Sequence, residues 1–191
     1  MEITNLVEWQ RVDSRNGLIE PWLTHPFMET IKNWDLSEKV VLELGGGRGT
    51  AWWRKNCKWV DTIECNKSWA NQIFLDVTLE GLENGRLIDD NIADGTADGI
   101  IEYRKLFPTD KQYDIVVVDG IYRVESIEWA IKHFEGIGGI IIIDNLDQDF
   151  VFISPKAMEL IAPFDGEIFV QPGHVNHEGK PWNTRYVIVP K

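Results

Sequence analysis

The feature that most constrains the fold is a series of short, almost continuous apolar runs, several of which end in an acidic residue. Examples are "VVLEL" at 40–44, "IVVVD" at 115–119 and "IIIID" at 140–144. Strands that are buried on both faces give continuous apolar runs, whereas half-exposed strands alternate apolar and polar residues. These runs therefore predict the central strands of a parallel sheet with helices on both of its faces.

The same patterning predicts the order of the elements. Five strands are predicted in the first part of the chain, at Val40–Leu44, Trp59–Glu64, Arg86–Asp90, Ile115–Asp119 and Ile140–Asp144. Apolar residues at helical spacing predict helices around 27–34, 69–77 and 127–134. A further helix is predicted over Thr96–Phe107, because Pro108 cannot continue it.

The end of the chain departs from this alternation. A helix is predicted over Pro155–Ile161, and two strands follow it at Glu167–Val170 and Arg185–Val189 with no helical pattern between them. Consecutive strands without a crossover helix pair antiparallel. We therefore predict an α/β fold with a doubly wound, Rossmann-like, seven-stranded sheet, mostly parallel with an antiparallel C-terminal strand pair.

Composition and charge restrict the partners. The chain of 191 residues is long enough to bury a core, and its formal net charge is −12. Phosphate backbones and anionic membranes attract clusters of Lys and Arg, which are missing, so we expect no nucleic-acid partner and no membrane surface. The start, "MEITNLVEWQ", does not look like a signal peptide, and the two cysteines read as reduced thiols, so a cytoplasmic location is expected. The sequence gives no pattern that predicts an oligomer.

A glycine-rich turn follows the first predicted strand. Gly45, Gly47 and Gly49 form G-x-G-x-G, and Thr50 occupies the position where the dinucleotide fingerprint G-x-G-x-x-G has its last glycine. Glycines between a strand and a helix let the backbone approach a ligand closely. From the glycines alone, the turn could hold a pyrophosphate, hold a sulfonium nucleoside, or have no ligand.

A carboxylate at the end of the next strand supports a nucleoside. Glu64 ends "VDTIE", next to the glycine turn at the same edge of the predicted sheet. A carboxylate there can accept hydrogen bonds from both ribose hydroxyls, and charge-assisted bonds of this kind contribute about 1.5–3 kcal/mol. Dinucleotides and sulfonium nucleosides both contain this ribose, so Glu64 does not choose between them.

Taken together, "VLELGGGRGTAWW" and "VDTIECNKSW" resemble the first two motifs of the class I S-adenosylmethionine-dependent methyltransferases. The first motif there begins with an acidic residue, which Glu43 supplies. "YDIVVVDGIYR" and "GIGGIIIIDN" resemble the fourth-strand and fifth-strand motifs, and with "PWLTHPF" the resemblance covers about 17–145. It is strongest to small bacterial and phage methyltransferases. It implies S-adenosylmethionine as cofactor and one domain over 1–191.

The resemblance also implies site residues and subdivisions. It places Gly45, Gly47 and Gly49 beneath the methionine moiety and ribose, Glu64 at the ribose hydroxyls, Asp94 near the adenine, and Asp119 facing the methyl group. The implied parts of the domain are an N-terminal cap (1–37), a cofactor-binding core (38–145) and a C-terminal helix and hairpin with a lid loop (146–191).

Two interpretations of the strand ends remain open. In the first, Asp119, Asp144 and Asn145 hold Mg²⁺ or Ca²⁺, as in the catechol-type O-methyltransferases, although Tyr122 replaces the lysine of their D-A-D-K motif. In the second, Asp119 and Tyr122 orient a polar acceptor without a metal and Arg123 binds an anionic group of the substrate. Arg123 could instead pair with Asp119.

The four histidines receive different interpretations. The resemblance places His25 in a leader that folds over the active-site mouth, where it is a candidate base. His174 and His177 lie in a loop long enough to form a lid over a substrate. His133 lies off the apolar face of its helix and is expected to be solvated on the surface.

The sequence favours a methyltransferase that acts on a small polar molecule, with O-methylation as the preferred chemistry. The alternatives are a nicotinamide-dependent oxidoreductase and a non-catalytic nucleoside-binding or scaffold domain of the same fold. The glycine spacing and the reversed final strands count against the oxidoreductase.

Overall fold

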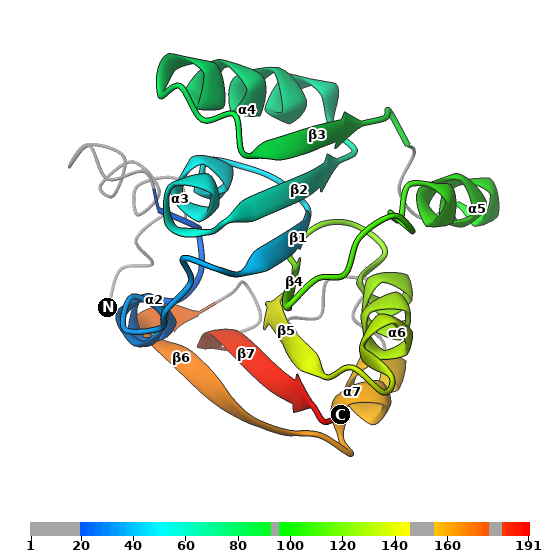
Figure 1. The fold of residues 1–191 in the computed structure, drawn as a ribbon. Coiled ribbons are helices and arrows are strands. Elements are labelled where there is room, and N and C mark those ends of the chain that lie inside the picture. Colours follow the sequence, from blue (N-terminus) through cyan, green and yellow to red (C-terminus); the bar gives the residue numbers. More distant parts are fainter. Residues whose placement is uncertain (1–19, 93–95, 146–154, 176–180) are drawn as a thin grey trace.

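The computed structural model describes residues 20–92, 96–145, 155–175 and 181–191, and its centre is a seven-stranded sheet (Figure 1). The strand order is β3-β2-β1-β4-β5-β7-β6. Five strands are parallel, with bounds β1 Val40–Leu44, β2 Trp59–Glu64, β3 Gly85–Asp89, β4 Ile115–Val118 and β5 Gly139–Asp144. The last two, β6 Asp165–Val175 and β7 Pro181–Val189, pair antiparallel, and β7 also lies antiparallel to β5. The predicted fold class is confirmed.

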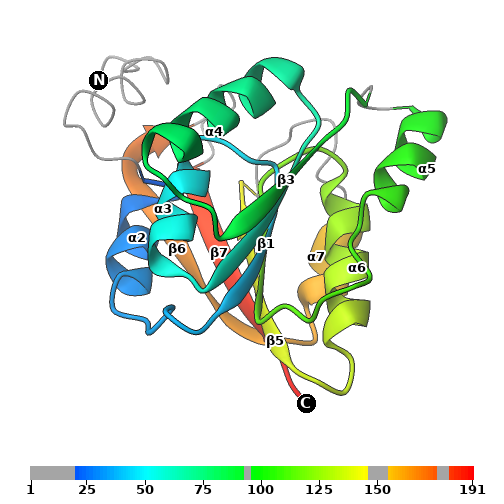
Figure 2. The same cartoon turned by 45° about the horizontal axis from the view of Figure 1, so that its top comes forward.

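Helices cover both faces of the sheet (Figure 2). On one face lie α2 His25–Ile31, α3 Gly49–Asn56 and α4 Lys67–Leu79, and on the other lie α5 Ala97–Lys105, α6 Arg123–Phe134 and α7 Pro155–Ile161. Neighbouring strand residues contribute to opposite cores. Val41 packs with Phe27 and Trp53 beneath α2 and α3, whereas Leu42 belongs to the cluster of Phe134 beneath α6. Burial on both faces explains why the central strands have continuous apolar sequences.

The predicted order of the elements holds, but some bounds differ clearly. β6 extends over Asp165–Val175 where 167–170 was predicted, β7 over Pro181–Val189 where 185–189 was predicted, and α3 was not among the predicted helices. The bounds of β1, β2 and α7 are as predicted, and β3 lies one residue earlier, at Gly85–Asp89. β4 ends at Val118, so Asp119 begins the loop that follows, although its N–H still donates to the Leu44 carbonyl at 2.8 Å. Thr96 is the N-cap of α5, where its hydroxyl accepts a hydrogen bond from the Gly99 N–H at 2.9 Å.

The prediction for His133 is wrong. Its Nε2 accepts a hydrogen bond from the Tyr113 N–H at 3.1 Å, and its ring stacks on Trp129 with 4.8 Å between the ring centroids. Partial burial lowers the pKa of His133, since a charged imidazole loses solvation there. The helical pattern showed that His133 lies off the most apolar stripe of its helix. It could not show that the Tyr113 N–H, in the loop before β4, would lie within hydrogen-bond distance of the ring.

Candidate functional site

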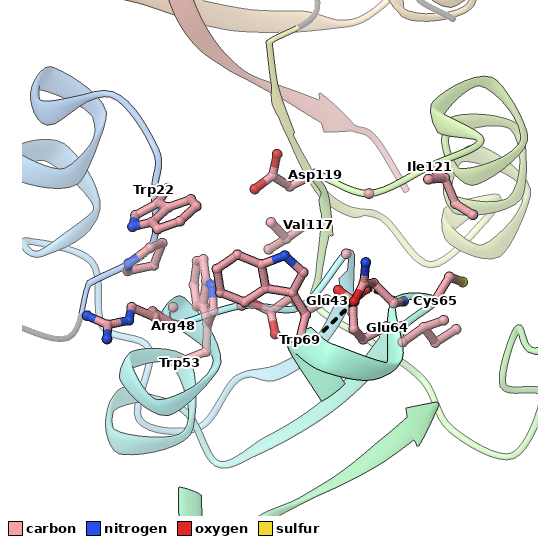
Figure 3. Close-up of a pocket in the computed structure, with 18 of the residues that line it drawn as sticks. Trp22, Glu43, Arg48, Trp53, Glu64, Cys65, Trp69, Val117, Asp119 and Ile121 are labelled. Carbon is pink, nitrogen blue, oxygen red and sulfur yellow. Dashed lines mark hydrogen bonds between the residues drawn. The ribbon is translucent and has the colours of Figure 1, made fainter. Parts of the chain in front are cut away.

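A cavity of about 570 Å³ opens at the carboxyl ends of β1, β2 and β4 (Figure 3). Its lining comes mainly from the segment 21–23 before α2, the turn 45–49, the stretch 63–66 at the end of β2 and the turn 119–121 after β4. The carboxyl ends of parallel strands meet at one edge of a sheet, and doubly wound folds bind their ligands there. This edge is therefore the candidate site.

The floor of the cavity is a contact between two glycine turns. Gly45 has φ +94°, and a Cβ on it would lie 2.2 Å from the Gly120 nitrogen. A side chain at either position would push the two turns apart. A Cβ on Gly47 would meet no atom within 4 Å, whereas one on Gly49 would lie 2.6 Å from the Cα of Pro21. The glycine turn thus packs against the Gly120 turn at Gly45, faces open space at Gly47 and is covered at Gly49 by Pro21, in the segment that precedes α2.

Glu43 lies beneath the glycine turn with its carboxyl group buried. One of its oxygens accepts hydrogen bonds from the hydroxyls of Thr50, at 2.6 Å, and Thr62, at 3.0 Å. Burial raises the pKa of Glu43 to about 8, because removal from water disfavours the charged form more than the two hydroxyls favour it. The environment of Glu43, which also lines the cavity, therefore favours the protonated form of this carboxyl group, and the cofactor-binding role predicted for it stays a prediction.

Glu64 stands at the tip of β2 on one side of the cavity (Figure 3). Its carboxylate accepts a hydrogen bond from the Asn66 N–H at 2.6 Å. Burial raises the pKa of Glu64, while backbone N–H groups of Asn66, Gly46 and Cys65 oppose the rise. The backbone thus holds this carboxylate in place at the cavity wall.

Asp119 lines the cavity at the tip of β4 and pairs with Arg123. The guanidinium donates to the Asp119 carboxylate at 3.2 Å and to its carbonyl at 3.1 Å, and the Asp119 side chain remains 31% exposed. Withdrawal from water raises the pKa of Asp119 to about 6, and the charge of Arg123 limits the rise. The sequence left open whether Arg123 binds an anionic group of the substrate or pairs with Asp119, and in this structure it pairs with Asp119.

Tyr122 and His25 do not line this cavity in the described structure. Tyr122 is buried in a left-handed conformation, with φ 49°, and its hydroxyl donates to the Thr96 carbonyl at 3.2 Å and accepts from the Thr96 N–H at 3.3 Å. His25 begins α2 and is exposed, and its N–H donates to Gln171 Oε1 at 2.7 Å. Their contacts tie elements together, and the catalytic roles predicted for them gain no support from these positions.

The three predicted metal ligands do not form a cation site. Asp144 accepts hydrogen bonds from Thr184 Oγ1, at 2.6 Å, from Trp182 Nε1, at 3.2 Å, and from the Asn145 side-chain amide. Asp119 meanwhile pairs with the Arg123 guanidinium. Over the described part of the chain, no group of three His, Cys, Asp or Glu side chains is arranged to hold a metal ion. The oxygens that would bind Mg²⁺ or Ca²⁺ are thus engaged by protein donors.

Three candidates lie outside what the structure describes. Asp94 falls in the gap at 93–95 and His177 in the gap at 176–180. His174 belongs to β6, but its side chain is not described. The adenine and lid roles given to them stay predictions.

Tryptophans form a wall that the sequence did not place. Trp22 and Trp69 meet edge-to-face, with 5.5 Å between their ring centroids, and Trp53 lies behind them (Figure 3). Trp69 fits the apolar stripe of α4 in the sequence, but it is 36% exposed and reaches the cavity mouth. The helical pattern could have placed Trp69 and Trp53 on their helices, but the contact with Trp22 joins parts of the chain far apart in sequence.

Comparison with solved structures gives the class of the fold. No protein-family model matches the chain, and no curated protein matches it in sequence. A putative rRNA methylase from Clostridium thermocellum aligns at TM-score 0.61 and 15% identity, over 87% of this chain and 95% of that one. The N-methyltransferase NodS from Bradyrhizobium japonicum aligns at TM-score 0.59 and 12% identity, over 87% and 98%. A SAM-dependent methyltransferase from Aquifex aeolicus aligns at 0.53 and 14%, over 88% and 91%.

The chain therefore has the class I S-adenosylmethionine-dependent methyltransferase fold, as the resemblance of its motifs implied. At these identities the likeness defines the fold and leaves the reaction to the site itself.

One prediction about partners is wrong. The net charge of −12 predicts no nucleic-acid partner, but solved structures with this fold include an rRNA methylase and a putative rRNA methylase. A net charge summed over a whole chain does not describe the potential at one cavity. Charge therefore does not exclude such an acceptor. As for membranes, none of the helices in the described ranges is long and apolar enough to cross one.

Proposed function

We propose that this chain binds S-adenosylmethionine in the cavity and transfers its methyl group to a polar acceptor. The observation that carries the proposal is the close main-chain contact of Gly45 with Gly120 in a cavity that the carboxylates of Glu64 and Asp119 also line. A nucleoside with an extended tail fits a floor of this kind, because backbone can approach it closely. Glu64 would hold the ribose hydroxyls.

The methyl donor supplies an already activated group, so the protein mainly orients the acceptor and excludes water. For the acceptor we propose a hydroxyl group on a small polar molecule. A hydroxyl must lose a proton as it is methylated, and Asp119 is the carboxylate at the cavity that can receive it. Its pKa of about 6 suits a base that works near neutral pH.

Calorimetry tests the cofactor. We expect S-adenosylmethionine and S-adenosylhomocysteine to bind and NAD not to bind. Binding of NAD without either sulfur nucleoside would instead support a nicotinamide-dependent oxidoreductase. Glu64→Ala should weaken binding of both sulfur nucleosides at least about tenfold, because it removes a charge-assisted contact. Glu83→Ala, at an exposed glutamate, is the matched control.

The acceptor is tested by transfer of a labelled methyl group into a metabolite extract and into total RNA, each with Mg²⁺ and with EDTA. Label in small molecules supports the proposed acceptor, and label in RNA replaces it. We expect EDTA to leave the rate unchanged, because Arg123 engages Asp119 and three donors engage Asp144. Binding of S-adenosylmethionine with no transfer to either pool would favour a non-catalytic nucleoside-binding domain.

A further inference from the structure

The cavity has a wall built to donate hydrogen bonds, opposite Glu64. Figure 3 shows Trp53, Arg48 and Trp22 on one side and Glu64 with Cys65 on the other. Trp53 is 0% exposed, and its Nε1–H has no hydrogen-bond partner among the described residues. A buried N–H without a partner is unfavourable, and such groups in native proteins point to a missing acceptor.

Two further features on the same wall favour an anion. Arg48 is exposed at the rim, and no ion pair joins it to an acid of the described chain. It also occupies the N-cap position of α3, without a side-chain capping bond, and this helix of eight residues has no acidic residue in its first turn. The positive end of the helix dipole therefore meets no negative side chain of that helix. An indole N–H, a guanidinium and a helix N-terminus all suit the oxygens of a carboxylate.

We infer that Trp53 and Arg48 form a subsite for the carboxylate of the methionine tail of the cofactor. This inference rests on the proposed function. Glu64 and Trp53 lie on opposite sides of the cavity, so the tail of a nucleoside whose ribose is held at Glu64 would reach toward Trp53. Leu23 and Val117 pack in the same apolar cluster as Trp53. A hydrogen bond formed there is strengthened, because little water screens it. Trp53 thereby selects nucleosides that carry a carboxylated tail.

The test uses three ligands in calorimetry: S-adenosylhomocysteine, its analogue lacking only the carboxylate, and 5′-methylthioadenosine, which lacks the whole amino-acid tail. The unmodified protein should bind S-adenosylhomocysteine at least about tenfold more tightly than the decarboxylated analogue. Trp53→Phe keeps an aromatic ring and removes the N–H. It should weaken S-adenosylhomocysteine binding about tenfold or more and bring it close to that of the analogue. Binding of 5′-methylthioadenosine should not change.

Trp52→Phe is the matched control, since Trp52 is the next residue of α3, has a ring 4.9 Å from that of Trp53, and does not line the cavity. It should leave the ratio between the ligands unchanged. Arg48→Gln, at an exposed position, should reduce the preference for S-adenosylhomocysteine several-fold. If Trp53→Phe does not fold, the ligand ratio of the unmodified protein and of Arg48→Gln decides the question.

Equal affinity of the unmodified protein for S-adenosylhomocysteine and its decarboxylated analogue would overturn the inference while leaving the proposed function in place. The same holds if Trp53→Phe weakens all three ligands equally, since that result reports a distorted cavity wall. If the unmodified protein binds none of the three ligands and no S-adenosylmethionine, the proposed function itself fails.

Discussion

Replacing Glu43 by glutamine should change how the stability of the protein depends on pH. The Glu43 carboxyl group is buried, and its pKa is about 8 in the folded protein, against an ordinary value of 4.5. In the unfolded chain the group is solvated and titrates near the ordinary value. Between these two pH values the folded protein therefore keeps a proton that the unfolded chain releases, and folding becomes less favourable as the pH rises.

The magnitude follows from the separation of the two pKa values. Each pH unit between them corresponds to about 1.4 kcal/mol, so the contribution of Glu43 to the unfolding free energy falls by up to about 5 kcal/mol. That contribution is fully present below pH 4.5 and is lost as the pH rises through 8. Domains of this size have unfolding free energies of about 5–15 kcal/mol, so the change is large. Glutamine has no proton to lose, and its oxygen can still accept from Thr50 and Thr62.

The assay is urea unfolding, followed by tryptophan fluorescence, at several pH values from 5 to 8.5. Glu43→Gln should differ least from the unmodified protein at pH 5 and become increasingly more stable than it toward pH 8.5, by several kcal/mol at most. The control is Glu102→Gln, at an exposed glutamate, which should give a difference independent of pH. A constant difference between Glu43→Gln and the unmodified protein over this range would refute the reasoning.

Three further predictions concern single contacts. Gly45→Ala should lower the unfolding free energy by about 2–5 kcal/mol, because its Cβ would lie 2.2 Å from the Gly120 nitrogen, whereas Gly47→Ala should cost less than about 1 kcal/mol in the same urea titration. Arg123→Leu removes the charge that limits the pKa of Asp119, so the acidic limb of a methylation pH–rate profile should move to higher pH; an unchanged profile would exclude Asp119 as the base. Tyr122→Phe should reduce stability by about 1–2 kcal/mol while leaving the methylation rate unchanged, and a lost rate in a folded variant would restore the predicted catalytic role.

The central strands could be predicted from the sequence because a strand that is buried on both faces has an almost continuous apolar sequence. The runs at 40–44, 115–118 and 140–143 are apolar except for Glu43, since their neighbouring residues face two different cores. The antiparallel ending followed from the missing helical pattern before β7. The bounds of the two edge strands of the sheet were predicted less accurately. β3, an edge strand with half-exposed residues, lies one residue from its predicted bounds, and β6, the other edge strand, extends over Asp165–Val175, well beyond the predicted 167–170.

The site was predicted less completely, because its properties depend on contacts between distant segments. The motifs brought Gly45, Glu64 and Asp119 to one cavity. They could not show that Arg123 would engage Asp119, since a side chain at the start of a helix that follows a strand end can equally face a ligand. The partnerless N–H of Trp53 has no sequence signature at all, because a pattern of residue types does not record which hydrogen bonds are unmade.

The contact between Gly45 and Gly120 has a consequence for how the cavity can respond to a ligand. Both sides of it are main chain, so no rotamer change there can enlarge or reshape the floor. Adjustment on ligand entry is left to the walls, where the rings of Trp22 and Trp69 touch across the mouth. The segment before α2 that carries Trp22 is in turn hydrogen-bonded to β7, since the Thr24 N–H donates to Thr184 Oγ1 at 2.9 Å. A ligand that displaces Trp22 would therefore act on a segment that is hydrogen-bonded to β7, the last strand of the sheet in chain order.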